Sequence, residues 1–274
     1  MPAVTAANLR VSIVQGATRW HDPAGNREYY GAMIEALRGQ TDLVLLPETF
    51  TSGFSNEAIH RAETMDGPTV AWLRGQAGAL DAAISGSVQL RVGEGASAKV
   101  YNRLLFVTPD GSVRHYDKRH LFRYAGEHER YASGNQRLVV EWRDWRICPL
   151  VCYDLRFPVY SRNRHERAAA RFDYDLVLYV ANWPAARRHA WSTLLRARAI
   201  ENLSYCVGLN RVGVDGNSLQ YAGDSAVLDF LGQPLAELGA QEQLITVTLD
   251  AAALAAHREH FPAWMDADSY ELRD

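Results

Sequence analysis

The chain has 274 residues, of which 47% are hydrophobic and 22% charged, and this balance excludes disordered, collagen-like and low-complexity proteins. Its 29 basic and 32 acidic residues leave a net charge of −3, so we expect no general attraction to nucleic acid or to an anionic membrane. Three cysteines do not form a disulfide framework, and no apolar stretch reaches the roughly 18 residues of a membrane helix. Residues 1–8 contain no signal region, so we expect a soluble cytoplasmic protein.

Hydrophobic periodicity predicts strands and helices that alternate from end to end. In chain order we expect a strand at 9–15, a helix at 25–37, a strand at 43–46, a helix at 69–80, strands at 83–90, 100–107, 137–142 and 146–151, a helix at 158–171, a strand at 176–180, a helix at 190–202, and strands at 205–209, 225–229 and 244–249. This order favours an α/β fold whose sheets are covered by helices. No linker or composition shift divides the chain, so we expect one domain, residues 1–274.

Three chemically active side chains stand where apolar strands end. Glu48 follows Leu-Leu-Pro, Lys118 follows an alternating segment, and Cys152 ends a buried run. Ligands in α/β proteins bind outside the carboxyl ends of the strands, so these three residues are plausible neighbours in one pocket. A thiol nucleophile, a carboxylate base and an ammonium that stabilises an oxyanion together suit acyl transfer.

Residue types alone leave ordinary structural roles open. A glutamate after a strand is more often a surface or ion-pair residue, a buried cysteine is more often a small core residue, and a lysine is usually solvated. No Gly-x-Ser-x-Gly elbow occurs in the chain, which removes a serine hydrolase as a rival.

The segments around the three residues change this balance. Leu46-Pro-Glu-Thr-Phe-Thr-Ser-Gly-Phe54, Tyr116-Asp-Lys-Arg-His-Leu-Phe122 and Val151-Cys-Tyr-Asp-Leu-Arg-Phe-Pro158 closely resemble the three signature segments of the nitrilase, or carbon–nitrogen hydrolase, superfamily. The resemblance covers essentially the whole chain. Further segments at 179–184, 196–202 and 210–213 look like bacterial members of the ω-amidase branch.

The resemblance implies an α-β-β-α sandwich that forms a homodimer and uses a Glu–Lys–Cys triad without a cofactor. Position by position, Glu48 matches the base, Lys118 the oxyanion lysine and Cys152 the nucleophile. A further glutamate, the fourth catalytic member, matches Glu127, seven residues before Gly134, with Glu129 as the competitor. In the expected mechanism the backbone N–H of Tyr153 shares the oxyanion with the lysine.

Residues near the triad are candidates for substrate binding. Phe54, Asn182 and Trp183 follow buried strands or adjoin the first motif, and we expect them to line the pocket. Arg156 could bind a substrate carboxylate, or it could form an ion pair with Asp154 or near Glu48.

Other arginines and cysteines have weaker claims. Arg187 and Arg188 are the next candidates for the carboxylate after Arg156. Cys148 and Cys206 are expected to be core residues. The histidines have no metal-ligand spacing with the cysteines, so we expect no metal site.

These observations predict an amidase that hydrolyses the ω-amide of a small dicarboxylic acid monoamide, such as 2-oxoglutaramate or succinamate, through a thioester. One alternative keeps the fold and triad but hydrolyses a nitrile or an N-carbamoyl amine. Another is a catalytically silent binding module, against which the complete triad argues. A thiol redox enzyme is weaker still, because no Cys-x-x-Cys occurs.

Overall fold

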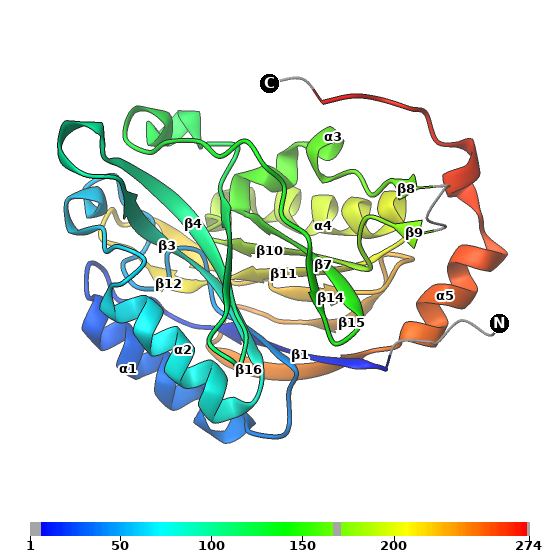
Figure 1. The fold of residues 1–274 in the computed structure, drawn as a ribbon, viewed down its shortest axis with the longest axis horizontal. Coiled ribbons are helices and arrows are strands. Elements are labelled where there is room, and N and C mark those ends of the chain that lie inside the picture. Colours follow the sequence, from blue (N-terminus) through cyan, green and yellow to red (C-terminus); the bar gives the residue numbers. More distant parts are fainter. Residues whose placement is uncertain (1–6, 167–170, 273–274) are drawn as a thin grey trace.

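Two six-stranded sheets lie face to face at the centre of the protein (Figure 1). The computed structural model describes residues 7–166 and 171–272. The first sheet contains, in spatial order, β16 (Gln243–Leu249), β1 (Leu9–Gln15), β2 (Leu43–Leu45), β3 (Ala83–Val92), β4 (Lys99–Val107) and β5 (Val113–Asp117). The second contains β15 (Pro234–Glu237), β14 (Ala226–Leu228), β11 (Tyr205–Asn210), β10 (Leu176–Ala181), β7 (Trp145–Val151) and β6 (Val140–Trp142).

Parallel strands occupy the middle of each sheet and are buried on both faces. In the first sheet β2 pairs in parallel with β1 and β3, and in the second β10 pairs in parallel with β7 and β11. Leu43 and Leu45 belong to the core cluster that the two sheets share, whereas Val44 and Leu46 belong to the cluster beneath the first pair of helices. This two-sided burial explains the continuous apolar runs of the sequence.

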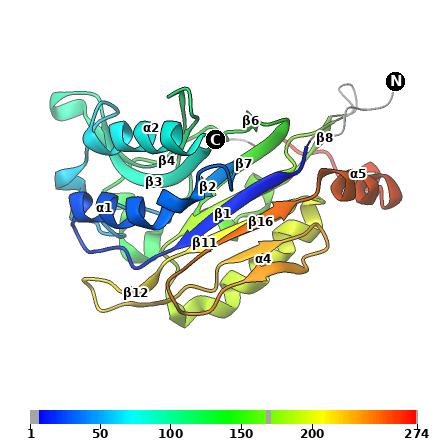
Figure 2. The ribbon, with the colours of Figure 1, turned by 90° about the horizontal axis from the view of Figure 1, so that it is seen from below.

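Helices cover the outer faces of both sheets. Figure 2 shows α1 (Pro23–Ile34) and α2 (Pro68–Leu80) on one side of the molecule and α4 (Arg188–Asn202) on the other. Asp22 caps α1 by accepting a hydrogen bond from the backbone of Gly25 at 2.9 Å. The predicted α-β-β-α sandwich is therefore confirmed.

The predicted helix over 158–171 is wrong. The helix α3 ends after one turn, at Pro158–Ser161, and a short pairing of β8 (His165–Glu166) with β9 (Arg171–Phe172) follows. Residues 167–170 of the predicted helix lie outside the described residues. The buried side chain of Asn163 donates two hydrogen bonds of 2.9 Å to backbone carbonyls of distant segments, so side-chain bonds replace a helical ladder here.

A last helix, α5 (Ala251–His260), is absent from the sequence-based prediction. It begins after Asp250, whose carboxylate accepts a hydrogen bond from the backbone of Ala253 at 3.0 Å. An Asp before an alanine-rich run is an N-cap signal, but only Leu254 of this helix is buried, so no apolar stripe marks it. Over the described residues, no helix has both the length and the apolar character that crossing a membrane requires.

Candidate active site

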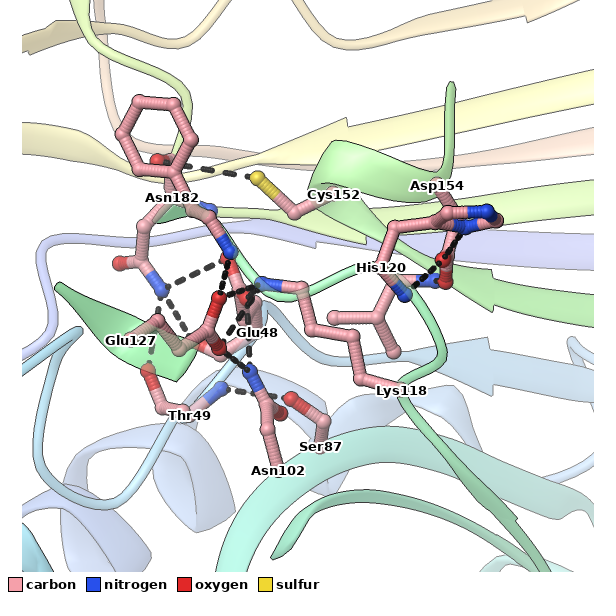
Figure 3. A network of polar contacts seen from close by, with 12 residues as sticks. Glu48, Thr49, Ser87, Asn102, Lys118, His120, Glu127, Cys152, Asp154 and Asn182 are labelled. Atoms are coloured by element: carbon pink, nitrogen blue, oxygen red, sulfur yellow. Dashed lines mark hydrogen bonds and ion pairs between the residues drawn. The ribbon is translucent and has the colours of Figure 1, made fainter. Parts of the chain in front are cut away.

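Side chains from both sheets meet near the ends of β2, β5, β7 and β10 (Figure 3). Glu48 lies three residues beyond β2, and Lys118 lies directly after β5. Cys152 follows β7, and Asn182 follows β10. The two sheets thus contribute different members of one polar cluster, which lies where α/β folds place their ligands.

Glu48 is fully buried and accepts hydrogen bonds on both carboxylate oxygens. Its Oε1 accepts from Nζ of Lys118 at 2.9 Å and from Nδ2 of Asn102 at 2.8 Å. Its Oε2 accepts from the backbone N–H of Asn182 at 2.8 Å. Asn182 also donates from Nδ2 to the carbonyl oxygen of Glu48 at 2.7 Å. The expectation that Asn182 lines the pocket is therefore refined, because its amide is engaged in holding Glu48.

Lys118 lies between two carboxylates, and its side chain is 1% exposed. Its Nζ lies 2.9 Å from Oε1 of Glu48 and 3.0 and 2.9 Å from the two oxygens of Glu127. Burial alone would lower the pKa of Lys118, but the Glu127 and Glu48 charges outweigh it and raise that pKa well above its usual value. Lys118 is therefore an ammonium throughout the neutral range.

Glu127 is the second carboxylate of the site. It is fully buried, and its Oε2 also accepts a hydrogen bond of 2.5 Å from the backbone of Phe122. Burial raises the pKa of Glu127, Lys118 opposes that effect, and the Glu48 charge adds to it. The side chain of Glu129, in contrast, is 70% exposed and lies 3.9 Å from His128. The structure thus brings Glu127, and not Glu129, to the lysine.

Cys152 opens the short 3₁₀ turn Cys152–Arg156 with a backbone φ of +45°. This left-handed conformation is costly for a residue with a Cβ, and such strain concentrates at functional sites. Its Sγ lies 3.9 Å from the carbonyl oxygen of Asn182. Burial raises the pKa of the Cys152 thiol well above its ordinary value, the Glu48 carboxylate raises it further, and Lys118 opposes them. The sulfur therefore keeps its proton until a base removes it.

Asp154 fixes the turn that carries the cysteine. Its Oδ2 accepts hydrogen bonds from the backbone of Val151 at 3.0 Å and from the Tyr116 hydroxyl at 2.9 Å. Its Oδ1 lies 3.1 Å from the backbone nitrogen and 2.7 Å from Nδ1 of His120. Asp154 thereby ties the end of β7 to β5 and to the segment that follows Lys118.

Of the predicted pocket residues, Phe54 contacts this cluster directly, and Tyr153 and Trp183 adjoin Cys152 and Asn182 in the chain. The ring centroid of Phe54 lies 5.4 Å from Nζ of Lys118. Tyr153, the second residue of the turn, packs its ring edge-on against Phe122 at 5.0 Å between centroids. Trp183 is 4% exposed, and its backbone N–H donates to Oδ1 of Asn210 at 2.8 Å.

The three candidate arginines differ in their surroundings. Arg156 is exposed, and its guanidinium lies 5.0 Å from the Trp183 ring centroid, while the Asp154 carboxylate is occupied by the donors named above. Arg188 pairs with Asp224 through two hydrogen bonds of 3.0 and 2.6 Å. Arg187 is partly buried, with its guanidinium 5.4 and 5.1 Å from the ring centroids of Phe122 and Tyr124.

Two supporting residues, Asn102 and Asp154, were not recognised from the sequence as parts of the site. Asn102 is a buried residue of β4, a strand that also contains Lys99 and Arg103, so its polar side chain alone does not mark it as part of a site. Asp154 lies two residues after the cysteine, where it was considered only as an ion-pair partner. Among residues 7–166 and 171–272, no group of three or more His, Cys, Asp or Glu side chains is arranged to hold a metal ion.

Known proteins resemble this chain along nearly its whole length. The carbon-nitrogen hydrolase family model matches residues 10–259. The chain belongs to the carbon–nitrogen hydrolase family. The family resemblance of the three sequence segments is thereby confirmed.

Individual relatives in the carbon–nitrogen hydrolase family narrow the comparison. The chain is 48% identical to the ω-amidase YafV of Escherichia coli, over 96% of this chain and 98% of that protein. It is 29% identical to the 2-oxoglutaramate amidase of Bacillus subtilis, over 93% and 96% of the two chains. The crystal structure of XC1258 from Xanthomonas campestris, a CN-hydrolase superfamily protein with an arsenic adduct in its active site, is 65% identical with a TM-score of 0.95, over 97% of this chain and all of that one.

Proposed function

We propose that this carbon–nitrogen hydrolase hydrolyses the ω-amide of small dicarboxylic acid monoamides, such as 2-oxoglutaramate or succinamate, to a carboxylate and ammonia. The buried cluster of Glu48, Lys118 and Glu127 beside the Cys152 thiol carries the proposal. The similarity to an ω-amidase and to a 2-oxoglutaramate amidase supports the substrate class. We also propose that the protein acts as a homodimer in the cytoplasm.

Acylation begins with proton transfer from the Cys152 thiol to Glu48. The sulfur forms a bond to the amide carbon, and the electron pair of the C=O bond moves onto the oxygen. The Lys118 ammonium and the Tyr153 backbone N–H stabilise this oxyanion. When the oxyanion collapses, the C–N bond breaks, and Glu48 returns the proton to the leaving nitrogen, which departs as ammonia. The acyl group remains on Cys152 as a thioester.

Deacylation uses the same groups, with water as the nucleophile and the Cys152 sulfur as the leaving group. A water molecule gives a proton to Glu48 while its oxygen attacks the thioester carbon. The second oxyanion collapses, the C–S bond breaks, and the sulfur takes the proton back. Glu127 does not exchange protons in this scheme; it holds the Lys118 ammonium in place through two hydrogen bonds.

Arg187 is the residue that we assign to the distal carboxylate of the substrate. Its guanidinium is shielded by two rings, and among the described residues none is paired with it as Asp224 is with Arg188. The Phe122 ring beside it contacts Tyr153, which adjoins the nucleophile. Arg156 is more exposed, so water would weaken its contribution more.

Release of ammonia from succinamate and from its methyl ester tests the proposal. We expect kcat/KM for succinamate to exceed that for the ester by about 10²-fold, because a partly buried cation left without its partner penalises the neutral analogue. Cys152→Ala should show no turnover of either substrate. Turnover of nitriles or N-carbamoyl amines in place of succinamate would contradict the proposed substrate class.

Arginine variants locate the carboxylate site. Arg187→Leu should lower kcat/KM for succinamate by about 10- to 100-fold and leave the methyl ester unaffected, because a charge-assisted pair contributes about 1.5–3 kcal/mol. Arg188→Leu, which removes a neighbouring exposed charge, is the matched control and should change neither rate. An effect confined to Arg156→Leu would move the carboxylate site to the Trp183 side.

A further inference from the structure

Asn102 donates hydrogen bonds to both carboxylates of the site (Figure 3). Its Nδ2 lies 2.8 Å from Oε1 of Glu48 and 3.4 Å from Oε1 of Glu127. Nζ of Lys118 lies 2.9 and 3.0 Å from the same two oxygens. Two nitrogen donors and two oxygen acceptors therefore alternate around a closed ring, in which each carboxylate oxygen lies between a neutral and a charged donor.

The orientation of the Asn102 amide follows from the charges around it. The residue is 1% exposed, and its Oδ1 has no hydrogen-bond partner within the described residues. Rotating the amide by half a turn would bring Oδ1 against the two carboxylate oxygens, which is worse than leaving a carbonyl unpaired. An unpaired buried carbonyl has a free-energy cost that a side chain kept for packing alone would not require.

The ring contains one positive charge, on Lys118, and two negative charges, on Glu48 and Glu127. The two buried carboxylates share the same two nitrogen donors, and the repulsion between neighbouring like charges promotes uptake of a proton by one of them. A donor that binds the charged form opposes that uptake. Asn102 supplies such a donor to both carboxylates, and its backbone carbonyl accepts a hydrogen bond of 3.0 Å from the backbone of Lys118. One residue thus supports all three charged members of the cluster.

We infer that Asn102 is a positioning residue whose side-chain amide orients Glu48 and Glu127 beside Lys118 and opposes uptake of a further proton by this cluster. Glu48 is then free to accept the thiol proton of Cys152. This inference deepens the proposed function and rests on it for its kinetic consequences, but the protonation of the cluster can be measured without amide turnover.

Asn102→Leu removes the donor and keeps the approximate volume. We expect kcat for succinamate to fall about 10- to 100-fold, as for a lost hydrogen bond to a charged group, with KM changed less than about threefold. The acid limb of the kcat/KM profile should move to higher pH, because the cluster as a whole takes up a proton more readily without the donor. Asn102→Ser, which is too short to reach either oxygen, should show the same shift if the leucine variant does not fold.

Asn102→Asp separates hydrogen-bond donation from shape. At neutral pH the third carboxylate should depress kcat more than leucine does, because it repels the other two. As the pH falls, its activity relative to that of the wild type should recover, since a protonated aspartate donates a hydrogen bond again. A ratio that is independent of pH would contradict the inference.

Asn163→Leu is the matched control, because Asn163 is also a buried asparagine that donates twice, outside the site. It should lower the melting temperature without moving the pH profile.

The pH dependence of Cys152 alkylation by iodoacetamide gives a second readout, in which Asn102→Leu should move the acid limb to higher pH and Asn163→Leu should not. If wild type lacks amidase activity, the proposed function fails while the alkylation profile still tests Asn102. Profiles of Asn102→Leu that superimpose on wild type, or an equal shift in Asn163→Leu, would overturn the inference.

Discussion

Cys152, the proposed nucleophile, has a strained backbone conformation. A φ of +45° places a residue with a Cβ in the left-handed region, at the point where β7 turns into the following 3₁₀ turn. The turn directs the sulfur toward Asn182 and the polar cluster (Figure 3). Thr49, directly after Glu48, has a φ of +43°, so the proposed base and the nucleophile both adjoin strained backbone.

This strain predicts an inverted order of stability for two inactive variants. Cys152→Gly should be more stable than Cys152→Ala by about 0.5–1 kcal/mol, because glycine adopts the left-handed conformation without a Cβ clash. Urea unfolding of both variants measures the difference. At Cys148, inside β7 and without a positive φ, the same pair of substitutions should give the opposite order. Equal stabilities at position 152 would show that the turn relaxes freely.

At the scale of elements, Asp154 joins the turn after β7 to the region around β5. Both of its oxygens accept two hydrogen bonds each, from Val151, Tyr116 and two nitrogens of His120. The nucleophile and the oxyanion lysine lie on different sheets, so this carboxylate is one of the contacts that fix the distance between them.

Asp154→Asn should therefore harm both stability and turnover. Either orientation of the amide turns an N–H group toward donors, so we expect a loss of about 2–3 kcal/mol in unfolding free energy and a lower kcat. Urea unfolding and steady-state kinetics measure the two effects. Asp173→Asn, which weakens a pairing with Arg137 and Arg164 away from the site, should lower stability and leave kcat unchanged. A kcat for Asp154→Asn equal to that of wild type would show that the turn is held by other contacts.

The ends of β2 and β7 were predictable from the sequence, and the resemblance of the segments around them marked Glu48 and Cys152. Glu48 and Cys152 follow continuous apolar runs, which are read directly as strands buried on both faces. Asn102 could not be found in this way, because its partners lie 54 and 25 residues away and its strand obeys no pattern that requires an amide. The helix predicted over 158–171 fails because the bonds of Asn163, which hold a loop, leave no trace in local periodicity.

At the scale of the whole molecule, the interior holds many phenols and thiols that resist ionisation. Burial raises the pKa of Cys148 to about 12 and also raises the pKa values of Cys206, Tyr116, Tyr174 and Tyr179 well above their ordinary values. In the unfolded chain these groups lose their protons near pH 8.5 for thiols and near pH 10 for phenols. Above those values the unfolded state binds fewer protons than the folded state, so stability falls as pH rises.

We therefore expect the melting temperature to be maintained near neutrality and to fall steadily above about pH 8.5, more steeply above about pH 10. Thermal unfolding followed by circular dichroism between pH 7 and 11 measures this dependence. Cys148→Val removes one of the thiols and should weaken the slope between about pH 8.5 and 10. A melting temperature that stays constant up to pH 11 would mean that the buried groups ionise in the folded state.

Because the cluster is divided between two sheets, turnover depends on how the sheets are aligned. Glu48, Asn102 and Lys118 belong to one layer, and Cys152 and Asn182 belong to the other. Sliding one layer against the other by a fraction of an ångström would leave every strand and helix intact, yet it would separate the sulfur from its base. Heat or pressure that loosens the contact between the two sheets should therefore abolish turnover while the circular dichroism of the secondary structure is unchanged. Turnover then reports small displacements of the sheets before any loss of strands or helices is detected.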